Sequence, residues 1–120
     1  MTRVVLVVDD EADIRAIARV ALETIAGWRM LEATSGDQAL AALAGGVPDA
    51  VLMDHLLTGE DGLMVAARLR QEAGLTGVPI LMMSAASTAP TSDDVDGFIA
   101  KPFNPRTLAA QISAAAGWNA

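Results

Sequence analysis

The sequence predicts an α/β protein in which a parallel sheet is covered by helices on both faces. Short apolar runs alternate along the chain with longer segments whose apolar residues recur at helical spacing. The runs at residues 4–8 and 50–53 are apolar without a break. Such unbroken runs are typical of strands buried on both faces, as in a parallel sheet.

The first two strand–helix pairs are marked by their boundaries. Residues 4–8 are the β-branched run Val-Val-Leu-Val-Val, and apolar side chains at helical spacing follow over residues 14–25. Gly27 closes this helix, as glycine often does at a C-terminus. Residues 30–34 are a short strand candidate, and Ser-Gly-Asp-Gln at 35–38 is a capping box that predicts the start of a second helix.

Three further strands follow. The Gly-Gly-Val-Pro segment at 45–48 ends the second helix, and residues 50–53 form the third strand. A polar turn then leads into a helix from about residue 61 to 72. Residues 80–83 and 97–100 are the fourth and fifth strands.

The end of the chain predicts one more helix and one unusual connection. Asn104 and Pro105 suit the N-cap and first position of a helix that runs to Gly117. Residues 85–96 lack an apolar stripe and contain Pro90. We expect a loop there, with a fourth helix that is shortened or absent.

Composition limits the functions that this chain can have. Its 120 residues fit one domain over residues 1–120, and 52% of them are hydrophobic, enough for a sizeable core. A net charge of −7 argues against nucleic acid or an anionic membrane as a partner. The chain has no cysteine, which excludes disulfides and thiolate metal sites. No apolar run is long enough to span a bilayer, so we expect a soluble, cytoplasmic protein.

Polar residues stand where four of the predicted strands end. The carboxyl ends of parallel strands share one edge of the sheet, and ligands gather at that edge. An acidic, oxygen-only cluster suits a hard cation, above all Mg²⁺. An aspartate there is a competent nucleophile for a phosphoryl group, whose oxygens the metal, a lysine and a serine hydroxyl would contact. The residues are Asp9, Asp10, Asp54, Ser84 and Lys101.

Each of these residues also has a purely structural explanation. Asp9 and Asp10 could cap the next helix, Asp54 could serve a turn, and Lys101 could be an ordinary surface lysine. The joint pattern favours a site, because independent accidents would have to fall on four separate strand ends.

Five motifs in this order resemble the CheY-like receiver domain of two-component response regulators over the whole chain. The resemblance implies a flavodoxin-like (βα)5 three-layer sandwich with sheet order 2-1-3-4-5. The motifs are Val-Val-Asp-Asp-Glu at 7–11, Val-Leu-Met-Asp at 51–54, Asp-Gly at 61–62, Met-Met-Ser-Ala at 82–85 and Gly-Phe-Ile-Ala-Lys-Pro-Phe at 97–103.

The resemblance also implies a role for each site residue. Asp54 would accept the phosphoryl group, and Lys101 would contact it. The peptide bond between Lys101 and Pro102 would be cis. Ser84 and Phe98 would be the switch pair, although Phe98 could equally be a plain core aromatic. The Mg²⁺ ligands would be Asp9, Asp10, Asp54 and the backbone carbonyl of Leu56.

A receiver of this kind would take its phosphoryl group from a histidine kinase or a histidine phosphotransfer protein. We expect a monomer or weak dimer that signals by protein contact, carries no output domain and catalyses only its own phosphotransfer and dephosphorylation. The alternative is an interaction module with vestigial phosphorylation. A phosphohydrolase is disfavoured because Asp10 follows Asp9 directly, without the usual Asp-x-Asp spacing, and a nucleotide binder because no glycine-rich loop follows the first strand.

The chain departs from the family pattern in several places. Leu57-Thr58 replaces the usual Met-Pro, which we expect to affect loop rigidity without touching the catalytic groups. His55 is expected to be an exposed loop residue and no ligand. The gap from Ser84 to Lys101 is shorter than usual. The missing apolar stripe and Pro90 suggest that residues 85–96 are a mobile segment that orders on phosphorylation or binding. Apolar Leu56 and Ala86, beside the acceptor and the serine, predict a long-lived phosphoryl group because neither can orient a water molecule.

Overall fold

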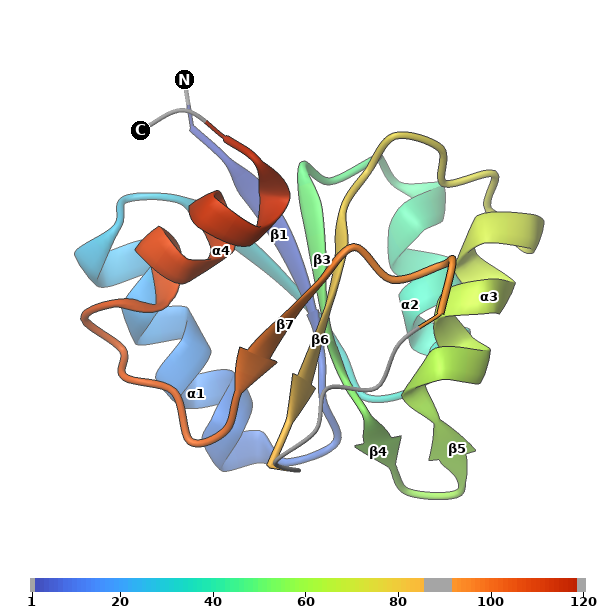
Figure 1. The fold of residues 1–120 in the computed structure, drawn as a ribbon, viewed down its shortest axis with the longest axis horizontal. Coiled ribbons are helices and arrows are strands. Elements are labelled where there is room, and N and C mark those ends of the chain that lie inside the picture. The colour runs from blue at the N-terminus through green and yellow to red at the C-terminus, as the bar shows by residue number, and fades with distance from the viewer. Residues whose placement is uncertain (1, 86–91, 119–120) are drawn as a thin grey trace.

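The computed structural model describes residues 2–85 and 92–118. A five-stranded sheet forms its centre, with every neighbouring pair of strands parallel (Figure 1). The strand order is β2-β1-β3-β6-β7, which is the predicted 2-1-3-4-5 order once a small hairpin, β4–β5, is set aside. The strands of the main sheet are β1 (Val4–Val8), β2 (Arg29–Ala33), β3 (Ala50–Asp54), β6 (Ile80–Ser84) and β7 (Gly97–Ala100).

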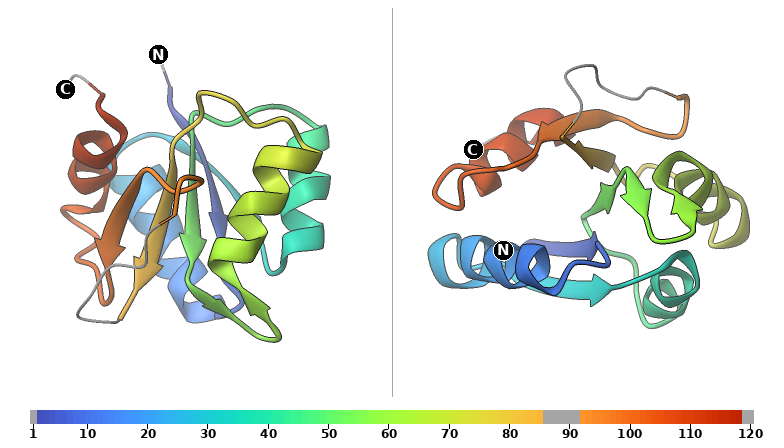
Figure 2. Two further views of the ribbon diagram at one scale, coloured as in Figure 1. Left: turned by 45° about the vertical axis from the view of Figure 1, so that its right-hand side comes forward. Right: turned by 90° about the horizontal axis from the view of Figure 1, so that it is seen from below.

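Helices cover both faces of this sheet, as Figure 2 shows. On one face lie α1, its π-helical continuation η1, and α4; on the other lie α2 and α3. The sheet separates two apolar clusters, because alternate residues of each strand point to opposite faces. The helices are α1 (Ala12–Arg19), η1 (Val20–Ile25), α2 (Gly36–Ala44), α3 (Gly62–Glu72) and α4 (Leu108–Ala116). None of the described helices is long and apolar enough to cross a membrane.

The predicted capping box does begin α2, with one change. The Ser35 hydroxyl oxygen accepts a hydrogen bond from the Gln38 N–H at 3.2 Å. The Gln38 side chain reaches back to the N–H of Thr34 at 2.8 Å, one residue before the cap. The box therefore also fixes the turn by which β2 enters the helix.

One predicted helix boundary and one predicted turn need correction. The last helix begins at Leu108 and not at Asn104-Pro105, because Asn104 caps a separate turn. Its side-chain oxygen accepts from the Arg106 N–H at 2.9 Å, and its carbonyl accepts from the Thr107 N–H at 3.0 Å. The polar turn before α3 is also more ordered than predicted, since it forms the antiparallel strands β4 (Leu56–Leu57) and β5 (Glu60–Asp61).

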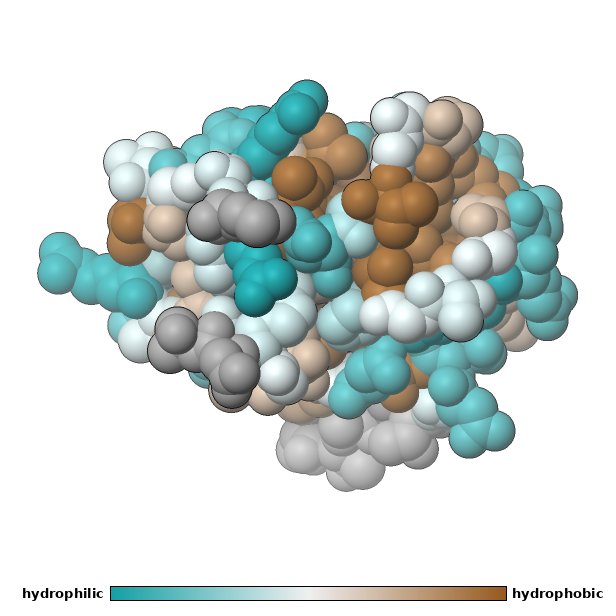
Figure 3. All heavy atoms as spheres, turned by 90° about the horizontal axis from the view of Figure 1, so that it is seen from above, coloured by the Kyte–Doolittle hydropathy of each residue, from teal (hydrophilic) through white to brown (hydrophobic). Residues whose placement is uncertain are grey.

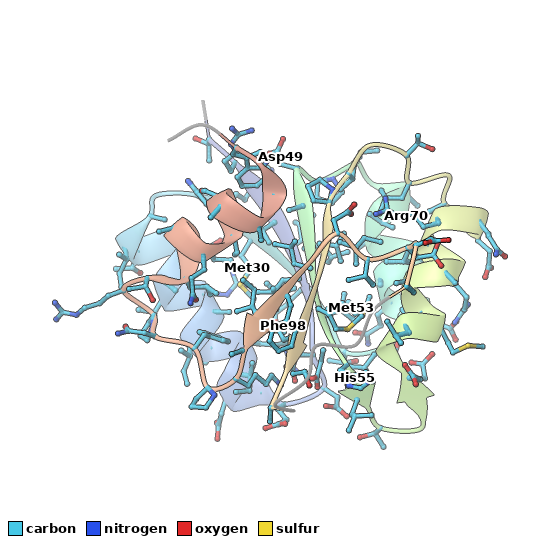
Figure 4. The ribbon with its side chains drawn as sticks, in the orientation of Figure 1. Met30, Asp49, Met53, His55, Arg70 and Phe98 are labelled. Carbon is cyan, nitrogen blue, oxygen red and sulfur yellow. The ribbon has the colours of Figure 1, made fainter. Side chains whose placement is uncertain are left out.

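The connection between β6 and β7 contains no helix in its described part. Residues 86–91 lie outside the described residues, and the mobility predicted for residues 85–96 falls largely on them. The chain that enters β7 is held by Arg70 of α3, seen between α3 and this segment in Figure 4. Its guanidinium donates to the carbonyls of Leu75, Val78 and Asp94 and to the Asp96 carboxylate.

Candidate functional site

The carboxyl ends of β1, β3, β6 and β7 meet at the lower edge of the sheet in Figure 1. Parallel pairing places the residues that follow these strands side by side. The register pairs Asp54 with Met83 and Ser84 with Ala100, so β3, β6 and β7 end together. The fold thus brings the predicted site residues to one rim.

Four carboxylates gather at this rim. Oxygen atoms of Asp9, Asp10, Glu11 and Asp54 all lie within 4.8 Å of one another. Asp9 is fully buried and Asp54 nearly so. Glu11 was not among the predicted site residues, although it belongs to the Val-Val-Asp-Asp-Glu motif. Its position as the N-cap of α1, directly after the strand end, is the signal that could have identified it.

Lys101 bridges two of these carboxylates. Its ammonium nitrogen lies 2.8 Å from Asp9 Oδ2 and 3.1 Å from Asp54 Oδ1. Burial works to lower the pKa of Lys101, but the hydrogen bonds and charges of Asp9 and Asp54 outweigh it and raise the pKa above its ordinary value. Lys101 therefore remains a cation at neutral pH. The Lys101–Pro102 peptide bond is cis, as expected.

Asp54 lies in the opposite electrostatic situation. Burial, and then the charge of Asp9, raise the pKa of the Asp54 carboxyl above its ordinary value. The contact with Lys101 and a hydrogen bond from the Leu56 backbone N–H offset part of this rise. The carboxylate of Asp54 is thus destabilised by its surroundings, and a further cation at the rim would stabilise it.

Asp10 is held by a residue that the sequence did not place in the site. The Thr58 N–H donates to Asp10 Oδ2 at 2.7 Å, and the Thr58 hydroxyl donates to the same oxygen. These two hydrogen bonds lower the pKa of the Asp10 carboxyl. The expectation that Leu57-Thr58 touches none of the catalytic groups is therefore wrong. A threonine at this turn brings two donors to the rim, whereas a proline would bring none.

Gly62 allows the β4–β5 hairpin to pack directly under the acceptor strand. A Cβ atom at this position would lie 2.2 Å from the Asp54 carbonyl oxygen and 3.0 Å from His55 Cα. The Gly62 N–H donates to the His55 carbonyl at 2.6 Å. A side chain at this position would push the hairpin away from the backbone of Asp54 and His55. This contact explains why glycine stands in the Asp61-Gly62 motif.

The remaining predicted residues also lie near the rim. Ser84 is buried and lines a hollow of 300 Å³ together with Asp54, Leu56 and Lys101. The Leu56 side chain is exposed, while its backbone contacts Asp54. Phe98 is half-buried on β7, in register with Met82 of β6 (Figure 4).

His55 is half-buried, which corrects the expectation of an exposed residue. Its N–H donates to the Met83 carbonyl at 2.9 Å, and this bond draws the loop against the sheet. It lines the same hollow but does not belong to the group of carboxylates. The prediction of a long phosphoryl lifetime also depended on Ala86, which lies outside the described residues.

The donor set fits a hard divalent cation. All four acidic side chains offer oxygen, the ligand that Mg²⁺ prefers, and a single lysine contacts two of them. Four negative charges facing one positive charge leave an excess that a divalent ion would balance. The arrangement can therefore hold a cation beside a buried carboxylate that faces a small hollow.

A second hollow, of 640 Å³, lies at the opposite end of the sheet, the end viewed in Figure 3. Apolar surface lies beside charged surface there. Two of its charged members, Arg70 and Asp96, already pair with each other at 2.7 Å. Among the described residues, no group of acidic side chains at this end matches the convergence of carboxylates at the rim, so the rim is the stronger candidate.

The chain is similar to known proteins over most of its length. The family model of the response regulator receiver domain matches residues 5–113. The phosphate regulon transcriptional regulatory protein PhoB of Pseudomonas aeruginosa is 38% identical over 117 residues, covering 93% of this chain and 51% of that protein. The same regulator from Escherichia coli is 34% identical, covering 95% of this chain and 52% of its own. The chain thus spans about half the length of these relatives.

Solved structures agree with the family match. A putative response regulator from Chloroflexus aurantiacus has a TM-score of 0.83 and 29% identity, covering 98% of this chain and 99% of its own. The chemotaxis response regulator CheY4 of Vibrio cholerae has a TM-score of 0.85 and 26% identity, covering 96% and 99%. Both similarities extend over nearly the whole of each chain.

Proposed function

The chain belongs to the response regulator receiver domain family, and we propose that it is a phosphorylation-dependent signalling switch whose phosphoacceptor is Asp54. One observation carries this assignment. The Asp54 carboxylate is nearly buried at the end of β3, 3.1 Å from the Lys101 ammonium and within the acidic cluster. Of the four clustered carboxylates, Glu11 and Asp54 line the hollow, and of these two only Asp54 is buried.

The proposed reaction transfers a phosphoryl group from a phosphohistidine of a kinase or phosphotransfer protein. A carboxylate oxygen of Asp54 attacks the phosphorus in line, the new O–P bond forms and the N–P bond breaks. The electron pair of that bond goes to the imidazole nitrogen, which takes a proton from solvent. A Mg²⁺ ion held by Asp9, Asp10 and Asp54, with the Leu56 carbonyl, would neutralise charge on the phosphoryl oxygens.

The residues around Asp54 have complementary parts in this proposal. Lys101 already contacts Asp54 and supplies a fixed positive charge for a phosphoryl oxygen. Ser84 lines the same hollow, and its hydroxyl would donate to another of these oxygens. Phe98, on the strand next to Ser84, would follow the movement of the serine and change the surface that a partner protein reads.

A small phosphodonor tests the proposal without the cognate kinase. We expect incubation with phosphoramidate and Mg²⁺ to add the mass of one phosphoryl group to the wild type and to the Asp13→Asn control. Asp13 is an exposed acidic residue in the first turn of α1 and does not belong to the group of clustered carboxylates. The Asp54→Asn variant should gain nothing. A wild-type protein without this acid-labile, Asp54-dependent mass would instead be an interaction module with vestigial phosphorylation.

A further inference from the structure

Two donors of Thr58 converge on a single oxygen of Asp10. The backbone N–H and the hydroxyl both bind Oδ2, from the turn that joins β4 to β5. Lys101, the nearest cation, contacts Asp9 and Asp54. Two of the clustered carboxylates are thus held by the lysine, and Asp10 is held from the other side by the hairpin.

The turn geometry explains how Thr58 reaches this position. Leu57 pairs with Glu60, so Thr58 and Gly59 are the two central residues of the turn. Gly59 has φ +75°, which is required at the second central position of a type II turn. Proline is common at the first central position of such a turn, but it has neither an N–H nor a hydroxyl. Threonine occupies the same place and adds two donors aimed at Asp10.

We propose that Thr58 is a positioning residue that fixes the Asp10 carboxylate for a divalent cation. The two hydrogen bonds occupy Oδ2, so that Oδ1 is the oxygen left for the ion. Carboxylates that bind metals are usually oriented in this way by hydrogen bonds from neighbouring groups, and loss of such a bond typically weakens metal affinity by about 10–100-fold. The inference rests on the proposed function, since it assumes a cation at the acidic cluster.

The same hairpin also contacts the phosphoacceptor. The Leu56 backbone N–H donates to Asp54, two residues before the Thr58 N–H donates to Asp10. A cation that binds Asp10 would therefore also affect the β4–β5 hairpin, which contacts Asp54 through the Leu56 N–H. Thr58 links metal occupancy to the loop after the acceptor.

Calorimetric titration of the purified protein with MgCl₂ tests the inference. Thr58→Val removes the hydroxyl at nearly constant volume, and we expect it to raise the Kd for Mg²⁺ about tenfold. Thr58→Ser keeps both donors and should bind within about twofold of the wild type. Thr76→Val makes the same chemical change at an exposed position at the opposite end of the sheet, and should bind as the wild type does.

The metal-free protein provides a second readout by NMR. The Asp10 carboxyl ¹³C resonance should shift in Thr58→Val and stay in place in Thr58→Ser. Equal or tighter Mg²⁺ binding by Thr58→Val, or an unmoved Asp10 resonance, would overturn the role of Thr58. A wild-type protein that binds no Mg²⁺ would refute the cation site itself, an outcome that the titration separates from the first.

Discussion

The surroundings of Asp54 in the folded protein disfavour its charged carboxylate, and the effect on stability can be measured. Burial and the charge of Asp9 raise the pKa of Asp54 in the folded state. Relative to the unfolded chain, the folded protein therefore favours the protonated form of the Asp54 carboxyl. This contribution to stability is complete below the unfolded pKa, near the ordinary value of 3.8, and is lost as pH rises through the higher folded pKa.

We predict that Asp54→Asn stabilises the protein at neutral pH, by about 1 kcal/mol in the free energy of unfolding. The neutral amide is not repelled by Asp9. We expect the gain from removing this repulsion to exceed the loss of the charge contact with Lys101. Urea unfolding of variant and wild type over a range of pH measures the difference, which should grow from pH 4 towards neutrality. A difference that stays constant across the pH range would show that charge is not the cause.

At the scale of elements, two contacts hold the loops around the sheet. Gly62 lets the β4–β5 hairpin sit against β3, and Arg70 ties the chain before β7 to the α3–β6 loop. Both residues act on backbone atoms, and neither lies in an apolar cluster. Their substitution should therefore affect local order as well as overall stability.

Gly62→Ala is expected to lower the free energy of unfolding by about 2–3 kcal/mol. The added methyl group would meet the Asp54 carbonyl at 2.2 Å, and backbone cannot yield as a flexible side chain does. Gly45→Ala is the matched control, because a Cβ atom at this position would make only an ordinary van der Waals contact of 3.6 Å with the Ala42 carbonyl oxygen. Its effect should stay below about 1 kcal/mol. Equal effects of the two substitutions in urea would contradict the packing argument.

Arg70 and Arg68 lie on the same helix, but we expect their substitution to lower the free energy of unfolding by different amounts. Arg70 is largely buried and donates to three carbonyls and one carboxylate, so Arg70→Ala should cost about 2–3 kcal/mol. Arg68 forms exposed ion pairs with Asp37 and Glu72, and Arg68→Ala should cost less than about 1 kcal/mol.

Hydrogen exchange provides a local readout for this pair of variants. The Ile80 N–H donates to the same Asp96 carboxylate that Arg70 binds. It should exchange faster in Arg70→Ala and at the wild-type rate in Arg68→Ala. Unchanged protection of Ile80 in both variants would mean that Arg70 does not hold this segment.

At the scale of the whole molecule, the sequence predicted what depends on periodicity. Every strand of the main sheet was predicted within one residue of its observed bounds. The unbroken apolar runs of β1 and β3 were the clearest signal, because burial on both faces leaves few alternatives. The gathering of Asp9, Asp54 and Lys101 followed from parallel topology alone.

The features that sequence reasoning missed depend on tertiary contacts. The two strands of the β4–β5 hairpin are two residues each, too short to show a period. Thr58 lies 48 residues from Asp10 along the chain, and no local pattern records their contact. The late start of α4 has a local cause instead, since Asn104 caps a turn that looks in sequence like the start of a helix.

The ends of the described chain lie together, far from the rim. The Arg3 guanidinium lies 4.2 Å from the centre of the Trp118 ring, and Trp28 packs edge-on against the same ring. Figure 1 shows both termini at the edge of the molecule opposite the β4–β5 hairpin. An affinity tag or sensor-surface tether at either end would therefore leave the rim facing solution. We therefore expect immobilised protein to bind Mg²⁺ with the same affinity, and to accept a phosphoryl group at the same rate, as protein in solution.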